Sequence, residues 1–391
     1  MKKETLVLRG RYLGEGPVLD CRLRDGCIAA VRRAGRGHAD IGHEDAILAP
    51  PLFDIQVNGL GGLDLQSPGL QPEHVAAMTR LLANHGVAHW VPTLVTGDLD
   101  VMEHCCRAIV AAMREPEVAR AMPGIHLEGP FISPVDGPRG AHPRAHVRIP
   151  DVKEFDRLYR AADSKVVYAT LAPELPGAVP FIRALVRRGV VVSLGHHHAS
   201  REQIDAAVAA GATMCTHLGN GSAPHMPRHV NPLWPQLADD RLAASLIADG
   251  HHLPDEVLKT FVRAKGGDNI VLISDCVYLT GLRAGKYVSF GSEVELRTDG
   301  KVCLAGTELL AGSATPLLEG VVHAAAATDL SLGGALRCAT SIPARLLGLR
   351  YRLGALKKGG RAHVIAFDLT RAGGRVRPRL QAVFIRGRQW L

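Results

Sequence analysis

The feature that most constrains the fold is an alternation of short apolar segments and helix-like segments that begins at Pro50. Alternation of this kind is typical of a parallel sheet, because each parallel connection usually returns through a helix. Eight strands within about 220 residues favour a (β/α)₈ barrel over an open sheet. The expected strands span 53–57, 89–94, 124–127, 165–169, 190–194, 213–216, 243–247 and 270–273, and the expected helices span 73–85, 100–114, 151–161, 178–188, 200–210 and 254–264.

Both ends of the chain have a different, β-rich pattern. Neither end is large enough to bury a core alone, so we expect them to form one small β-sandwich together. This divides the chain into a sandwich made of residues 1–49 and 350–391 and a barrel domain of residues 50–349. After the eighth barrel strand, residues 287–304 predict an inserted hairpin with a turn at Asp299-Gly300. The expected sandwich strands span 5–8, 18–23, 27–31, 46–48, 363–367 and 382–385, and two late helices span 313–327 and 333–347.

Composition limits the class of function. Hydrophobic residues make up 47% of the chain and charged residues 21%, which indicates a sizeable core. The net charge of +8 could help to attract a small anionic substrate, but we favour an arginine-rich composition without a functional role as its cause. There is no dense basic run and only 4% of residues are aromatic, so nucleic acid is not an expected partner. No glycine-rich phosphate-binding motif follows any expected strand.

The cysteines and the apolar runs predict a soluble, cytoplasmic protein. The eight cysteines lack CxxC spacing, which favours reduced thiols over a disulfide framework. The apolar segment after the basic start ends at Arg9, too early for a signal peptide. No apolar run approaches the roughly 18 residues that a membrane span needs.

Polar residues at the ends of the expected strands indicate the chemistry. Glu128, His196 and His217 each end a different strand, and Asp275 ends the eighth. The carboxyl ends of barrel strands form the catalytic face, so these side chains should meet there. Each alone could be a helix cap, a salt-bridge partner or a loop contact. Together, Glu, His and His form a three-ligand set for a catalytic metal, with Asp275 available as the proton acceptor for water.

At this point the sequence resembles the amidohydrolase superfamily and, within it, the family of N-acetylglucosamine-6-phosphate deacetylases. The segments that carry the resemblance occur in the family's order and cover nearly the whole chain. They are PPLFDIQVNGLGG (50–62), GIHLEGPFISP (124–134), RGAHP (139–143), SLGHHHA (193–199), THLGNG (216–221), IADGHHL (247–253), LISDC (272–276) and LAGSATPLLEGV (310–321).

The resemblance implies a barrel flanked by a small β-sandwich, and it implies residue roles. It implies that Glu128, His196 and His217 are metal ligands and that Asp275 carries a proton from the attacking water to the leaving amine. It implies that His142 polarises the acetyl carbonyl.

The resemblance also places the substrate. It implies that His252 contacts the sugar and that Asn220 and Gly221 lie in the loop that meets the phosphate. Arg228 matches an arginine that reaches the phosphate of the neighbouring subunit's substrate, and for this reason we expect a homodimer.

The first strand end bears on the number of metal ions. Many amidohydrolases have His-x-His there and bind two ions, whereas this chain has Gln56 and Asn58. Neutral amides are poor ligands for zinc-type ions, so we expect one divalent ion per subunit: zinc, with iron or another divalent ion as alternatives. His197 and His198 are expected to lie in the loop or behind the ligands, and His251 is left without a role.

The expected reaction is metal-dependent hydrolysis of N-acetylglucosamine 6-phosphate to glucosamine 6-phosphate and acetate. The alternative is another N-acyl amino sugar, either the galacto epimer or an unphosphorylated sugar, or a cyclic amide. The departures HLGNG and SDC fall around the sugar and phosphate and leave the expected ligands intact. A non-catalytic sugar-phosphate sensor would need a broken site, and Glu128, His196, His217 and Asp275 are all present.

Overall fold

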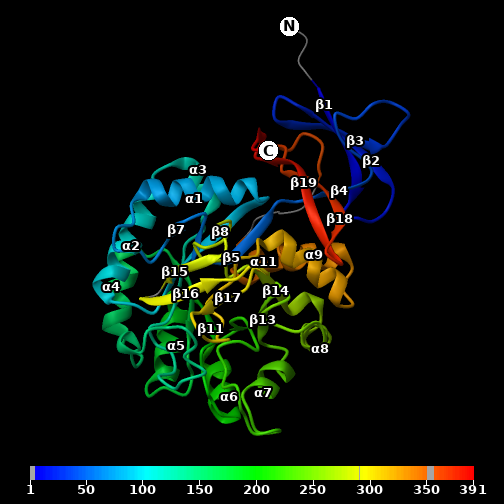
Figure 1. Cartoon of the computed structure of the whole chain (residues 1–391). Coiled ribbons are helices and arrows are strands. Elements are labelled where there is room, and N and C mark those ends of the chain that lie inside the picture. Colours follow the sequence, from blue (N-terminus) through cyan, green and yellow to red (C-terminus); the bar gives the residue numbers. More distant parts are fainter. Residues whose placement is uncertain (1–4, 290, 350–355) are drawn as a thin grey trace.

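A computed structural model describes residues 5–289, 291–349 and 356–391. Its centre is an eight-stranded parallel sheet rolled into a barrel, with helices around the outside (Figure 1). The order of the strands follows the sequence, as predicted for a (β/α)₈ barrel. The barrel strands are β5 (Leu52–Val57), β8 (Val87–Val95), β9 (Ile125–Glu128), β10 (Val166–Leu171), β11 (Val191–Leu194), β12 (Met214–Cys215), β13 (Ala243–Ile247) and β14 (Ile270–Ile273).

Helices cover the outer face of the barrel because one side of each is apolar. The six helices predicted between the strands are all present, and the structure adds two short ones, α3 and α7, that the sequence did not predict. The barrel strands are mostly apolar because both faces are buried, and every residue of β5 and β8 is buried. The helices are α1 (Pro72–Asn84), α2 (Leu99–Ala112), α3 (Pro116–Ala121), α4 (Val152–Ala161), α5 (Ala178–Arg187), α6 (Arg201–Ala210), α7 (Leu233–Ala238) and α8 (Asp255–Lys265), with short 3₁₀ turns at Arg144–His146 and Gly267–Asn269.

The barrel closes between β5 and β14 at the ends of these two strands. The backbone N–H of Asp275 donates to Gln56 O at 3.1 Å, and Asn58 N–H donates to Cys276 O at 2.8 Å. A side chain also joins the two strands, because Asp54 Oδ1 accepts from Ser274 N–H at 3.2 Å. The first and last barrel strands therefore meet beside Asn58 and Asp275, which both line a cavity at this end of the barrel.

An excursion follows β14 and returns to the barrel. It contains the predicted hairpin, with a third strand: β15 (Gly285–Ser289), β16 (Ser292–Leu296) and β17 (Val302–Leu304) form one antiparallel sheet. The predicted Asp299-Gly300 turn lies between β16 and β17. Three helices follow, α9 (Leu317–Ala327), α10 (Leu332–Cys338) and α11 (Ser341–Leu346), so the helix expected over 333–347 is two helices. Two more short strands in this part of the chain, β6 (Gly59–Leu60) and β7 (Leu63–Asp64), form a small hairpin after β5.

Both ends of the chain contribute to a second sheet, as predicted, and they lie together beside the barrel (Figure 1). This sheet has its own hydrophobic core, and Ile28 N–H in the edge strand β3 donates to Gly360 O, in the segment that leads into β18. Its order is β20-β19-β18-β4-β1-β2-β3. The strands are β1 (Leu6–Tyr12), β2 (Val18–Arg24), β3 (Cys27–Arg33), β4 (Ile41–Ala49), β18 (Val364–Ala372), β19 (Arg375–Ile385) and β20 (Arg388–Gln389).

The expected domain boundary at residue 350 lies outside the described residues, so the division into 1–49 with 350–391 and 50–349 stays a prediction. Within the described part of the chain, no helix has both the length and the apolar character to cross a membrane.

Candidate active site

The predicted site residues surround one cavity at the carboxyl ends of the barrel strands. The cavity has a volume of about 250 Å³. Its walls include eight of the nine residues predicted for the site: Glu128, His142, His196, His217, Asn220, Gly221, His252 and Asp275. The ninth, Arg228, is exposed in the loop after His217 and does not line this cavity.

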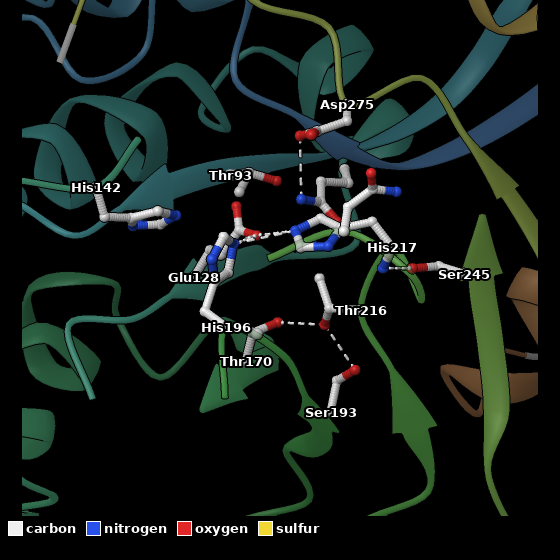
Figure 2. Close-up of polar contacts among 12 residues, drawn as sticks. Thr93, Glu128, His142, Thr170, Ser193, His196, Thr216, His217, Ser245 and Asp275 are labelled. Atoms are coloured by element: carbon white, nitrogen blue, oxygen red, sulfur yellow. Dashed lines mark hydrogen bonds and ion pairs between the residues drawn. The ribbon is translucent and has the colours of Figure 1, made fainter. Parts of the chain in front are cut away.

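Glu128, His196 and His217 turn their polar atoms toward one point (Figure 2). Glu128 Oε1 lies 3.2 Å from His196 Nε2 and 2.8 Å from His217 Nε2, and the two Nε2 atoms are 3.1 Å apart. All three side chains are buried. Ligand bonds of about 2.0–2.1 Å in a tetrahedral site place ligand atoms about 3.3 Å apart, close to these separations. In the described part of the chain, this is the one cluster with three such ligand atoms.

The hydrogen bond on the far side of His196 supports a metal ion at this point. His196 Nδ1 is 3.0 Å from Pro138 O, and a carbonyl can only accept, so Nδ1 carries the proton. A neutral His196 then directs the lone pair of Nε2 at a carboxylate oxygen and at a second imidazole nitrogen. A cation between these atoms would turn that repulsion into coordination, and Pro138 O would fix the tautomer as second contacts of metal-bound histidines do. The residues present fit a divalent ion.

Three of the site residues adopt a backbone conformation that side chains rarely allow. His196, His217 and Asp275 have φ values of 52°, 30° and 50°. Positive φ costs free energy in residues other than glycine, and it persists where the surrounding structure fixes it. Each of these residues follows a barrel strand, so the strained turn directs its side chain across the barrel mouth.

Asp275 lies across from Glu128, His196 and His217 (Figure 2), and two amide side chains donate to it. Asn58 Nδ2 donates to Asp275 Oδ1 at 2.7 Å, and Gln56 Nε2 donates to the same oxygen at 3.1 Å. The second carboxylate oxygen, Oδ2, has no hydrogen-bond partner among the described residues. Burial, together with the negative charge of Glu128, raises the pKa of Asp275 to about 6. A carboxyl with that pKa and one free oxygen is suited to accept and return a proton near neutral pH.

His142 is held as a hydrogen-bond donor to the cavity. Its Nδ1 accepts from Thr96 N–H at 3.4 Å, so the ring proton of the neutral form is on Nε2. Burial lowers the pKa of His142 well below its usual value, which keeps the ring neutral. The ring packs edge-on against His196, with 4.2 Å between centroids. The remaining N–H of His142 is therefore available to an oxygen atom bound beside the ligand cluster.

A buried layer of hydroxyl groups supports the ligands from inside the barrel. Thr216 Oγ1 lies 2.7 Å from both Thr170 Oγ1 and Ser193 Oγ (Figure 2). His126 joins this layer, because its Nε2 is 2.8 Å from Thr170 Oγ1. Thr216 precedes His217, so a satisfied network at this depth fixes the strand end that carries a ligand.

The loop after His217 faces the cavity with an unused donor. Asn220 Nδ2 is buried and has no hydrogen-bond partner among the described residues, as expected for a group reserved for a ligand. Gly219 leaves room for a neighbouring ring, because a Cβ at that position would lie 2.9 Å from the ring of Phe261. A side chain of α8 therefore fills the space next to Gly219. Gly221 is required by φ of +57° and by His196, whose Nδ1 would lie 2.8 Å from a Cβ there.

Three further histidines near the strand ends, His197, His198 and His251, do not line the cavity. His197 is buried and its Nδ1 accepts from Ala199 N–H at 3.3 Å, whereas His198 is exposed. His252, in contrast to these three, does line it.

Two parts of the site were not predicted. Residues 308–312, after β17, form one wall of the cavity, and Glu308 in this wall pairs with Arg297 at 2.9 Å and with Lys301. Asp249 lies behind His252, 2.8 Å from its Nδ1. The sequence signal for Asp249 was its spacing, three residues before a histidine at the end of a barrel strand, but that spacing alone does not separate it from a turn residue.

Comparison with known proteins agrees with this geometry. The Amidohydrolase family profile matches residues 65–389. N-acetylglucosamine-6-phosphate deacetylase from Bos taurus is 38% identical over 351 residues, which are 86% of this chain and 83% of that protein. N-acetylgalactosamine-6-phosphate deacetylase from Escherichia coli O157:H7 is 34% identical over 370 residues, which are 93% of this chain and 95% of that protein.

A solved structure covers the whole chain. It is an aspartate-to-alanine variant of N-acetyl-D-glucosamine-6-phosphate deacetylase from Mycobacterium smegmatis in complex with N-acetyl-D-glucosamine-6-phosphate. It has a TM-score of 0.85 and 28% sequence identity, and it covers 100% of both chains. The chain therefore belongs to the amidohydrolase family and, within it, to the family of N-acetylglucosamine-6-phosphate deacetylases.

Proposed function

We propose that this protein hydrolyses the acetamide bond of N-acetylglucosamine 6-phosphate, giving acetate and glucosamine 6-phosphate. The observation that carries the proposal is the convergence of Glu128, His196 and His217 on one point, with the amide-held Asp275 across from them. Two relatives named for this activity, from Bos taurus and Homo sapiens, are 38% identical to this chain over most of their length. The proposal thus assigns a metal-ligand set and a proton carrier to the walls of one cavity.

The side chains divide the chemistry among them. A divalent ion bound by Glu128, His196 and His217 supplies Lewis-acid activation of water and of the acetyl carbonyl. Asp275 accepts a proton from water at Oδ2 and then gives it to the nitrogen of the amine as the C–N bond breaks. His142 donates from Nε2 to the carbonyl oxygen, whose negative charge grows as water adds. One carboxyl serves both proton transfers because they occur in sequence.

The proposed cofactor is one divalent ion per subunit, zinc, with iron or another divalent ion as alternatives. A Glu-His-His set suits several ions of this kind. The amides of Gln56 and Asn58 donate to Asp275, which gives them a role other than metal binding. Metal analysis of the purified protein by mass spectrometry would test both the identity and the number of ions.

The proposed assembly is a homodimer in which Arg228 reaches the phosphate bound by the other subunit. Arg228 is exposed outside the cavity of its own chain, which is compatible with a role in trans. Exposed apolar side chains on the same segment, Val230 and Trp234, supply surface for such contact. Light scattering at working concentrations would test the dimer, and a fully active monomer would remove Arg228 from this role.

The location is proposed to be the cytoplasm. All eight cysteines are free, and most are buried, as expected for a chain kept in a reducing compartment.

The division into a β-domain of residues 1–49 and 350–391 and a barrel of residues 50–349 is likewise a proposal. Limited proteolysis would test that division.

The galacto epimer should be tested in the same assay, because one relative is named N-acetylgalactosamine-6-phosphate deacetylase. Acetate release should be measured on N-acetylglucosamine 6-phosphate, N-acetylgalactosamine 6-phosphate and both unphosphorylated sugars. We expect the highest kcat/KM for N-acetylglucosamine 6-phosphate, and none after removal of the metal. A higher value for the galacto epimer would transfer the assignment to that sugar, and activity confined to unphosphorylated sugars would refute the proposal.

A further inference from the structure

Asp249 is a buried carboxylate directly behind the cavity wall. It lies just after β13 and is 8% exposed. Its Oδ1 accepts from the backbone N–H groups of His251 and His252 at 2.8 and 2.9 Å. Its Oδ2 is 2.8 Å from His252 Nδ1 and accepts from Ser313 Oγ at 3.0 Å. Four hydrogen bonds converge on one carboxylate that does not itself line the cavity.

These contacts determine which nitrogen of His252 carries the proton. Burial would raise the pKa of Asp249, but the hydrogen bonds and the nearby imidazole outweigh it and keep the pKa below its usual value. An ionised carboxylate can only accept, so His252 Nδ1 must be the donor. The other ring nitrogen, Nε2, has no hydrogen-bond partner in the described part of the chain, and His252 lines the cavity. In a neutral ring, Nε2 is then an acceptor.

Asp249 also joins the histidine to the segment that carries Asp275. Ser313, which donates to Asp249, is paired through its backbone N–H with Asp275 O at 3.0 Å. The carboxylate therefore holds His252 at a fixed distance from the strand end of the proton carrier. A residue whose only duty was to close the 249–252 turn would need just the two backbone N–H contacts.

We propose that Asp249 is a positioning residue that keeps the proton of His252 on Nδ1, so that Nε2 accepts a hydrogen bond from a hydroxyl group of the sugar ring. The inference rests on the proposed function and extends it by naming the direction of this hydrogen bond. The substrate must then offer an O–H at this point, and a substituent that only accepts is disfavoured. Exchange of donor and acceptor roles at a buried contact is costly because it leaves a polar group unpaired.

The direct test compares Asp249→Asn with His252→Ala and with the double variant. The introduced amide keeps an oxygen for the two backbone N–H groups but offers an N–H to His252 Nδ1, which moves the ring proton to Nε2. We expect kcat/KM on N-acetylglucosamine 6-phosphate to fall about 10- to 100-fold, mainly through KM. The double variant should be no worse than H252A. His251→Ala is the control, because only the backbone of His251 contacts Asp249, and it should stay within about threefold of wild type.

Fluorinated substrates report the direction of the hydrogen bond. Fluorine cannot donate, so wild type should discriminate against the 3-deoxy-3-fluoro or the 4-deoxy-4-fluoro analogue, whichever carries the change at the contacted hydroxyl. D249N should lose this discrimination because its His252 presents an N–H. Discrimination that is unchanged in D249N would overturn the inference.

A measurement on the wild-type protein guards against a variant that folds poorly. Nitrogen-15 spectra of the histidine rings, with His252 identified by its loss in H252A, should give a protonated Nδ1 and an unprotonated Nε2. The opposite tautomer would overturn the inference whatever the variants do. If H252A is impaired and D249N is not, Asp249 loses its role while the proposed function stands; if neither is impaired, the sugar contact of His252 itself is wrong.

Discussion

The amide of Asn58 should control the pH at which the enzyme becomes active. Asn58 Nδ2 donates to Asp275 Oδ1 at 2.7 Å, and both side chains are buried. A hydrogen bond to a charged group contributes about 1.5–3 kcal/mol, and one pH unit corresponds to about 1.4 kcal/mol. Asn58→Leu removes the donor at similar volume, so the pKa of Asp275 should rise by about one to two pH units.

The sign follows from the proposed role of Asp275 as proton acceptor. Its carboxylate form is the active one, so activity is lost as pH falls through its pKa, which is about 6 in the metal-free chain. A bound cation lowers that pKa in both proteins but leaves the difference between them. We therefore expect the acidic limb of the kcat/KM profile to move to higher pH in N58L. Activity should fall about 10- to 100-fold below the wild-type inflection and recover on the alkaline side.

The assay is a pH profile of acetate release by wild type, N58L and Gln56→Leu, with metal content measured for each. Gln56 Nε2 donates to the same oxygen at the longer distance of 3.1 Å, so its removal should move the limb less. Coincident acidic limbs for N58L and wild type, at equal metal content, would refute the reasoning. A larger movement in Q56L than in N58L would also contradict it.

Three further predictions concern stability and metal binding. Burial raises the pKa of Asp54 from 3.8 to about 7, so its ionisation costs folding up to about 4 kcal/mol as pH rises across that range. D54N should therefore gain thermal stability over wild type as pH rises from about 4 to about 7, and a pH-independent gap would contradict this. The buried Lys265 donates from Nζ to Gln236 O at 2.8 Å and Asp239 O at 2.7 Å. K265M should lose about 2–4 kcal/mol in denaturant unfolding, and a loss under about 1 kcal/mol would show that these two hydrogen bonds do not stabilise the fold as proposed. Chelation should lower the Tm of wild type but not that of Glu128→Gln, which should hold less metal per chain; equal responses would remove Glu128 from the ligand set.

The fold was largely predictable because its signals are local. Most barrel strands are short, mainly apolar runs followed by a polar residue. Adjacent residues in the sequence therefore predict both the strand and its carboxyl end, where Glu128 or His217 lies. The helix expected over 333–347 is interrupted because Pro343 lacks an N–H and fits only the first turn of a new helix, α11. The short helix α7 contains Pro235 and only six residues, too few for a periodic signal.

The site was less predictable where it depends on contacts between distant segments. The sequence indicated that Asn58 is a poor metal ligand but not that it donates to Asp275, which lies 217 residues further along the chain. Nor does any local pattern place Ser313 against Asp249, across 64 residues. The proposed ligands could be placed from the sequence because each follows a barrel strand, whereas the partners that orient them depend on how the strand ends meet.

The pairing of β4 with β18 sets an order of assembly during synthesis. Ala49 pairs with Ile365, so one side of β4 has no neighbour until the whole barrel has left the ribosome. The apolar half of β4, residues 46–49, then exposes an open edge that can recruit other chains. In a nascent chain that stalls before Val364, the barrel would be complete but β4 would still lack its partner β18, and its open edge could pair with another chain. Slow translation of the last segment should therefore increase aggregation even when the catalytic residues are already in place.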